Sequence, residues 1–276
     1  GFDSVYLPAG LQKIGNSAFQ NNGLKEVTFP ARLSEIGNSA FQTNDLTSVI
    51  LPDTVTKLGK GAFATNAKLE RINLSKGLTE IPDGAFGCSD AKNYMTNLKS
   101  ITIPEGITKI GKRAFAGNNF AEIKLPSSMK EIGDYAFSTK NYLSDPCTLT
   151  LNEGLTVIGD NAFRNKVIGE VTLPVTVEKL KKNTFRKEYS DGSDAVVTKV
   201  YVSSKEQYED KVNFPASDFH KLYLTDESVW TAEDYTYAET TFTLYPAGET
   251  SKKVSVDAWV VSGLSEQGVK KLETNK

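Results

Sequence analysis

Few residues in this sequence have types and spacings suited to catalysis. A single histidine, His220, leaves no easy way to build a Ser/His/Asp arrangement or a metal site based on several histidines. The glycines recur once per repeated phrase, so no phosphate-binding G-x-G-x-x-G loop is predicted. The segment 191–194, DGSD, is too short and too poor in ligands for an EF-hand calcium loop. We therefore predict no catalytic residues, no cofactor and no metal ion.

Carboxylates are the remaining source of chemistry, because the sequence holds 34 Asp and Glu residues. A carboxylate pair that acts on a glycosidic bond is the enzymatic alternative that stays open. Chance proximity is expected among so many surface acids, so a non-enzymatic protein is favoured. The 32 Lys and Arg residues are spread among the acids and the formal net charge is −2, which argues against nucleic-acid binding. No apolar run approaches the length of a membrane span, so direct membrane insertion is not expected.

The two cysteines, Cys88 and Cys147, are too few for a disulfide framework. They fall two repeats apart, which in an undistorted stack of strands corresponds to roughly 10 Å. A disulfide needs a Cα separation below about 7 Å. Two separate buried thiols are therefore favoured, although a bridge closed by flexible loops stays open.

The elements that position these residues follow a phrase repeated about every 22 residues. Residues 27–48, VTFPARLSEIGNSAFQTNDLTS, closely match the segments before and after them. Each copy has an apolar-x-apolar pair with a third apolar residue three positions earlier, and this pattern predicts a short strand with one buried face. A fixed period of this length is typical of solenoids, in which each unit buries its apolar side only against its neighbours.

The rest of each copy predicts how the units stack. We expect a parallel β-sheet on one face and short helical or 3-10 turns on the other, an α/β solenoid. A glycine after the second apolar pair suits a tight turn at a φ that few other residues tolerate. One phenylalanine per copy is expected to stack into a spine under the sheet: Phe19, Phe41, Phe63, Phe86, Phe115, Phe137, Phe163 and Phe185.

The phrases LPAGLQKIGNSAFQNNGLKEV and IPEGITKIGKRAFAGNNFAEI resemble the BspA-like leucine-rich repeats of bacterial cell-surface proteins. The resemblance covers residues 2–224 in ten registers, and the last ones depart from the pattern, for example at Pro146, Lys181 and Thr184. It implies an extracellular or cell-surface location and non-catalytic adhesion to host or neighbouring-cell proteins. A carbohydrate or cell-wall ligand is the alternative. The chain opens inside a repeat, so we expect a piece of a longer protein, and the absence of a secretory signal at its start then says nothing about location.

The sequence changes character after residue 224, so we predict a solenoid at residues 1–224 and a small β-rich module at 225–276. TYAETTFTLYP and KKVSVDAWVVSG alternate and flank PAGETSKK, which predicts a hairpin. Short helices are predicted at Ser204–Val212 and from Ser265 onward. In proteins of this class a similar segment leads into further repeats, so the module is expected to be a connector. We expect the fragment to be monomeric.

Two surfaces are candidates for binding an extracellular protein. The first is the middle residue of each apolar-x-apolar pair, which must point out of the sheet because side chains alternate along a strand. Thr and Tyr are also simply good strand residues, so a purely structural role stays open. The residues are Tyr6, Thr28, Ile50, Asn73, Thr102, Lys124, Thr150, Thr172, Tyr201 and Tyr223.

The second candidate is a ridge made by three insertions that lengthen the phrase between its phenylalanine and the next strand. They are Gly87–Thr96, Ser138–Pro146 and Arg186–Val196. Each carries one tyrosine, Tyr94, Tyr142 or Tyr189, and tyrosine is favoured at interfaces. Recognition tends to sit on loops held by a rigid scaffold, but surface loops also tolerate drift in length.

Overall fold

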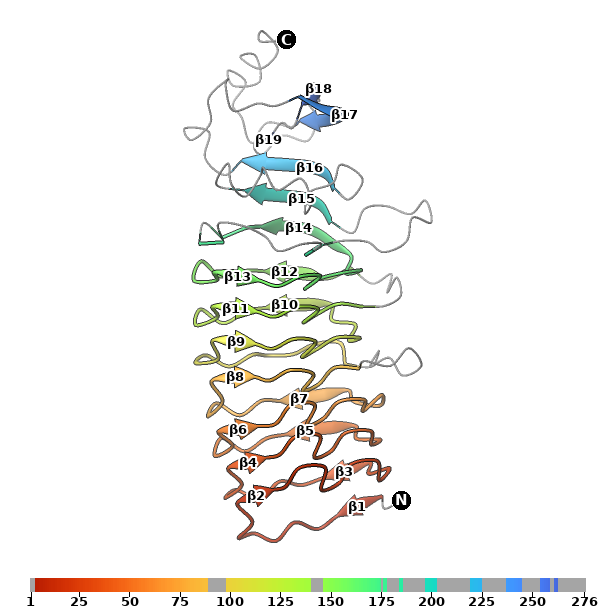
Figure 1. The fold of residues 1–276 in the computed structure, drawn as a ribbon, viewed down its shortest axis with the longest axis vertical. Coiled ribbons are helices and arrows are strands. Elements are labelled where there is room, and N and C mark those ends of the chain that lie inside the picture. The colour runs from red at the N-terminus through yellow and green to blue at the C-terminus, as the bar shows by residue number, and fades with distance from the viewer. Residues whose placement is uncertain are drawn as a thin grey trace.

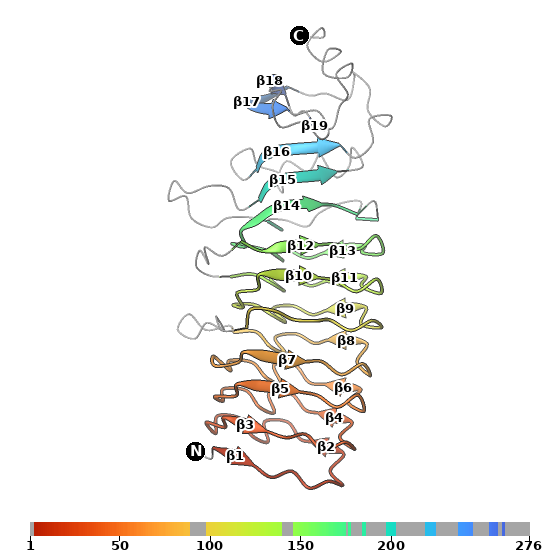
Figure 2. The ribbon, with the colours of Figure 1, turned by 180° about the vertical axis from the view of Figure 1, so that it is seen from behind.

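The chain forms an elongated β-solenoid whose rungs follow one another from the N-terminus (Figures 1 and 2). This is a computed structural model. It describes residues 3–88, 98–139, 146–174, 176–177, 184–185 and the strands at 197–202, 219–224, 237–244, 254–258 and 261–262. Most rungs contribute a short strand to one or both of two rows of parallel strands, here called ladders, on different sides of the stack. Strand pairing within each ladder is interrupted in places. The core lies between the ladders.

The first ladder is built by the apolar-x-apolar phrase and confirms the predicted parallel sheet. Its pairs keep the register of the repeat, with Val5 opposite Val27 and Val49 opposite Ile72. The phrase at 101–103 keeps its apolar residues buried without being a strand. The strands are β1 (Ser4–Val5), β3 (Glu26–Val27), β5 (Ser48–Ile50), β7 (Arg71–Asn73), β10 (Glu122–Lys124), β12 (Thr148–Thr150), β14 (Ile168–Thr172), β15 (Val197–Val202) and β16 (Phe219–Leu224).

A second ladder stands where helical or 3-10 turns were predicted, and that prediction is wrong. The described residues contain no helix, and the Ala-Phe phrase forms turns. The second ladder consists of β2 (Lys13–Ile14), β4 (Glu35–Ile36), β6 (Lys57–Leu58), β8 (Glu80–Ile81), β9 (Lys109–Ile110), β11 (Glu131–Ile132) and β13 (Val157–Ile158).

The backbone hydrogen bonds explain this difference. The Gly37 N–H donates to Ile14 O at 2.9 Å, and the Phe19 N–H donates to Ala40 O at 2.8 Å. Both bonds join neighbouring rungs, even inside the Ala-Phe phrase. A helix needs the same N–H groups for carbonyls four residues earlier, so pairing between rungs excludes it.

The phenylalanine spine is confirmed. Phe41, Phe63 and Phe86 stack with ring centroids 5.3 and 5.4 Å apart and interplanar angles of 5° and 3°. The column continues from Phe19 to Phe185 with centroid separations between 5.1 and 5.7 Å. Phe29 and Phe120 meet the column edge-on. Ring stacking under both ladders thus makes one continuous core out of units that could not bury their own apolar sides.

The repeated glycines serve close packing, which corrects the predicted reason for them. The five glycines of this kind that are named at the end of this paragraph all lack a left-handed φ. A Cβ on Gly59 would lie 2.3 Å from Asn38 N and from Gly37 C, and one on Gly37 would lie 2.6 Å from Asn16 N. Adjacent rungs therefore touch backbone to backbone along a glycine track. The track comprises Gly37, Gly59, Gly111, Gly133 and Gly159.

The C-terminal strands agree with the predicted hairpin, because β17 (Tyr237–Leu244) pairs antiparallel with β18 (Val254–Ala258). In addition, β19 (Val261–Ser262) joins the first ladder in parallel beside β16. The division after residue 224 stays a prediction, and the predicted helices at Ser204–Val212 and from Ser265 lie outside the described residues. Cys88 and Cys147 are both buried and neither is in a disulfide, as favoured above. Within the described residues, no helix could cross a membrane.

Candidate interaction surfaces

The outward row of the first ladder, here called the first face, contains eight of the ten residues predicted from the sequence. All eight are exposed, with Tyr6 at 86% and Ile50 at 50%, whereas the strand neighbours of Ile50 are buried. Tyr201 and Tyr223 continue the row in register with Thr172. The first face comprises Tyr6, Thr28, Ile50, Asn73, Thr102, Lys124, Thr150 and Thr172.

The first face has little interaction with the rest of the molecule. Within the described part of the chain, none of its eight side chains makes a hydrogen bond or an ion pair. Lys124 is its one charged residue, and the others offer hydroxyl, amide or aliphatic surface. The flanking outward row carries Glu26, Arg71 and Glu122, all exposed. The first face therefore presents polar groups that only solvent satisfies, on strands fixed by the core beneath.

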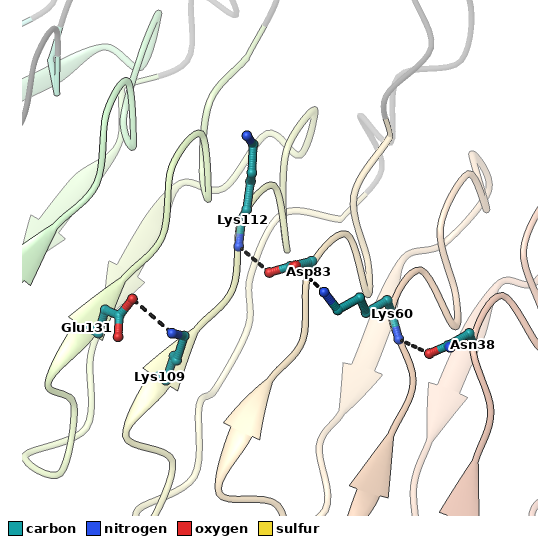
Figure 3. A network of polar contacts seen from close by, with 6 residues as sticks. All are labelled: Asn38, Lys60, Asp83, Lys109, Lys112 and Glu131. Atoms are coloured by element: carbon teal, nitrogen blue, oxygen red, sulfur yellow. Dashed lines mark hydrogen bonds and ion pairs between the residues drawn. The ribbon is translucent and has the colours of Figure 1, made fainter.

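The outward row of the second ladder, here called the second face, alternates in charge along the rungs. It runs Lys13, Glu35, Lys57, Glu80, Lys109 and Glu131. Lys13 Nζ lies 3.1 Å from Glu35 Oε2, and Lys109 Nζ lies 2.9 Å from Glu131 Oε1 (Figure 3). The hydrogen bond from Lys13 lowers the pKa of Glu35, and the one to Glu131 raises the pKa of Lys109. Four of the six charges of this face are thus joined in ion pairs.

A second row of polar contacts runs beside the glycine track. The Lys60 N–H donates to Asn38 Oδ1 at 2.8 Å, and the Lys112 N–H donates to Asp83 Oδ1 at 2.9 Å (Figure 3). Asp83 Oδ2 accepts from Lys60 Nζ at 2.9 Å, which lowers the pKa of Asp83. Because the track has no side chains, an open groove of about 530 Å³ lies over Gly37 and Gly59, between this row and the second face.

The sequence comparison settles the family. A family description, "BspA type Leucine rich repeat region", matches residues 1–97 and 88–190 with six copies. The chain belongs to the BspA-type leucine-rich-repeat family. This membership supports a non-catalytic repeat module. A comparison with curated protein sequences finds no match.

Solved structures of bacterial leucine-rich-repeat proteins are also similar. The pneumococcal vaccine antigen PcpA is 19% identical over 82% of this chain and 74% of its own, with a TM-score of 0.41. A leucine-rich repeat protein from Bacteroides ovatus is 18% identical over 80% and 77%, with a TM-score of 0.39. The T. pallidum leucine-rich-repeat protein is 32% identical over 40% of this chain and 48% of its own, with a TM-score of 0.34.

In three rungs of this BspA-type repeat, an asparagine three residues after the phenylalanine ties the rung to the one before. Asn44 Nδ2 donates to Phe41 O at 3.0 Å and to Phe19 O at 2.7 Å. Asn66 and Asn118 make the equivalent pairs of bonds. A buried side-chain amide thus satisfies two turn carbonyls that the ladders leave unpaired.

Lys166 occupies this asparagine position in a later rung, and sequence reasoning missed it. Its side chain is buried, its Nζ donates to Asn118 O at 2.6 Å and lies 5.4 Å from the centre of the Phe120 ring. Burial lowers the pKa of Lys166 from its ordinary 10.5 to about 8. Aligning the repeats against each other would have shown it, since a lysine there breaks the pattern of Asn44, Asn66 and Asn118.

The predicted loop ridge remains a prediction, because Tyr94, Tyr142 and Tyr189 lie outside the described residues. His220 lies on β16, for which the structure describes the backbone only. Among the residues whose side chains are described, no cluster of three His, Cys, Asp or Glu could hold a metal ion.

Proposed function

We propose that this chain is a protein-recognition module of a bacterial cell-surface or secreted protein, and that it binds a host or neighbouring-cell protein through its first face. The observation that carries the proposal is the absence of internal partners on that face. Within the described residues its side chains make no hydrogen bonds or ion pairs, so a partner can engage them without breaking contacts that stabilise the fold.

Desolvation favours the first face over the second. Covering Glu35 or Lys109 removes water from charges that already have partners, and a new ligand gains little there. Covering Thr28, Ile50 or Thr102 removes water from hydroxyl and aliphatic groups, whose loss of solvent a partner's backbone or hydroxyls can offset. Binding a partner at the first face therefore has a smaller desolvation cost than binding one at the second face.

Rigidity supports the same conclusion. Val49 and Leu51 on either side of Ile50 are buried, and the stacked phenylalanines hold the rungs in a fixed spacing. A surface that is already ordered loses little conformational entropy when a partner binds. Its outward residues repeat about every 4.8 Å along the ladder, which suits an extended surface on the partner.

The test is capture of ligands from arrays of host and bacterial proteins and of glycans by the purified chain. We compare Thr102→Glu on the first face with Thr79→Glu, a matched control beside the second ladder; both positions are exposed. We expect a protein ligand whose affinity falls about tenfold or more with Thr102→Glu and is unchanged with Thr79→Glu. Equal effects of the two variants would remove the first face from the proposal. Selective capture of a glycan would replace the protein partner by a carbohydrate.

A further inference from the structure

The position just before the Ala-Phe phrase lies in the left-handed backbone region, and several rungs have a second such residue two positions after the phenylalanine. This conformation brings the Cβ of any residue larger than glycine close to the backbone. Seven rungs show it, with φ between 53° and 64°, at Ser17, Ser39, Gly61, Gly84, Arg113, Tyr135 and Asn161.

Arg113 and Tyr135 depart from what this position requires. The other five rungs use Ser, Gly or Asn, which are small and in the case of Gly and Asn suited to a positive φ. The fold itself thus accepts a small residue here and gains nothing evident from a large one. Bulky residues held in this region persist where the surroundings compensate, and they are concentrated at functional sites. The two exceptions lie on consecutive rungs.

The Arg113 and Tyr135 side chains lie next to each other, and a second arginine, Arg164, also lies near the Tyr135 ring. Arg113 Cζ lies 5.3 Å from the centre of the Tyr135 ring, and Arg164 Cζ from the following rung lies 6.0 Å from it. Arg113 is exposed, while Tyr135 and Arg164 are half-buried. A guanidinium held over an aromatic ring can still donate its N–H groups to a carboxylate. Among the described residues, Arg113 has no ion-pair partner.

We propose that Arg113, Tyr135 and Arg164, here called the arginine–tyrosine stack, form a docking site for an acidic segment of a protein partner. Arg and Tyr are among the residues that most often supply binding energy at protein interfaces, and an arginine fork donates two parallel hydrogen bonds to a carboxylate. The inference rests on the proposal that the chain recognises proteins, but it uses the turn side of the rungs instead of the first face.

Charge around the stack favours isolated carboxylates over a dense polyanion. Asp134 immediately precedes Tyr135 in the same turn, and Asp160 occupies the equivalent position one rung later. Their carboxylates would repel a heavily sulfated chain or a nucleic acid, and the net charge of the whole chain is −2. A peptide with one or two well-placed Glu side chains meets the Arg113 guanidinium with less repulsion.

The test measures binding of two short synthetic peptides to the full chain by isothermal titration calorimetry. The peptides are identical except that one carries Glu where the other carries Gln. We expect binding of the Glu peptide that weakens as salt is added, and no binding of the Gln peptide. Arg113→Ser places at this position the residue that two other rungs use, and it is expected to weaken binding about tenfold or more. The control Arg32→Ser removes another exposed arginine and should leave affinity unchanged.

Melting temperatures are measured alongside, and Arg113→Ser is expected to be about as stable as the wild-type chain because Ser17 and Ser39 hold the same left-handed position in other rungs. Equal binding by Arg113→Ser and the wild-type chain would overturn the inference. Tighter binding of a sulfated polysaccharide than of the Glu peptide would overturn the choice of partner. If a captured protein responds to Thr102→Glu but not to Arg113→Ser, the proposed function stands and the docking site fails.

Discussion

The two faces share one core but differ in how far the fold restricts their outward residues. On the second face one row is committed to alternating charges and the next row is the glycine track, where a Cβ on Gly59 would meet backbone at 2.3 Å. On the first face the outward residue changes from Tyr6 to Ile50 to Lys124 with no contact that depends on it. Stacking thus constrains one side of the repeat and leaves the other free to vary.

The largest expected effect comes from the core that both faces share. Phe115→Ala removes a fully buried ring from the middle of the spine, where it stacks on Phe86 and Phe137 at 5.7 and 5.5 Å. We expect the free energy of unfolding to fall by ~3–5 kcal/mol in denaturant titration. Both ladders should be lost in one transition. A loss below ~1 kcal/mol, or separate transitions, would show that the faces do not stand on one core.

Lys166 tests the same core in another way, because its charge is buried there whereas the charges of the second face are exposed. Its pKa is about 8 when folded against an ordinary 10.5, so the folded state releases the proton first as pH rises. The unfolded chain then binds more protons than the folded one, and stability should increase between about pH 8 and pH 10.5. At pH 7 the full penalty is present, so Lys166→Met should raise the free energy of unfolding by roughly 3 kcal/mol.

The measurement is chemical denaturation across that pH range, with Lys124→Met as the matched control because Lys124 is exposed and is not among the charges that shift the pKa of Lys166. The control should keep the pH dependence of the wild-type chain, and Lys166→Met should abolish the part that rises above pH 8. If Lys166→Met destabilises the chain at pH 7, the hydrogen bond to Asn118 O outweighs the cost of burial.

A smaller effect distinguishes a glycine that is needed for close packing from one that is needed for a left-handed φ. Gly59→Ala forces a Cβ against neighbouring backbone and should cost about 1–3 kcal/mol, the range for overpacking. Gly61 has φ +62, and a Cβ there meets nothing closer than 3.6 Å. Gly61→Ala should therefore cost only the left-handed strain, about 1 kcal/mol. Thermal unfolding of both variants decides the order, and a greater loss for Gly61→Ala would contradict the packing role of the track.

The smallest expected effect concerns the charges themselves. Glu35→Lys places three positive charges in consecutive rungs of the second face, where Glu35 now lies between Lys13 and Lys57. Thr28→Lys adds one positive charge to the first face near Glu26 and should be neutral. We expect a small fall in melting temperature for Glu35→Lys that disappears in about 1 M NaCl, because salt screens exposed charges. A fall that persists at high salt would point to packing instead of charge.

The sequence was informative wherever the repeats could be compared with one another. The register of the first ladder, its outward row and the phenylalanine spine all follow from positions that recur in nearly every copy. It was misleading on the second ladder, because two-residue strands have no periodicity to detect and Ala-Phe is also compatible with a short helix. The glycine track was found, but its reason was wrong, since a glycine that avoids a clash and one that adopts a positive φ look alike in sequence.

By itself, the sequence determined the period, the family and the apolar face of each unit, because these depend on residue types at fixed intervals along one chain. Only the tertiary structure decided which rungs touch and at what distance. The stacking of Arg113, Tyr135 and Arg164, the burial of Lys166 and the pairing of Lys13 with Glu35 join residues from different rungs. A period states that the rungs are alike, but contacts between side chains of unlike rungs depend on the distance between rungs and the direction of each side chain.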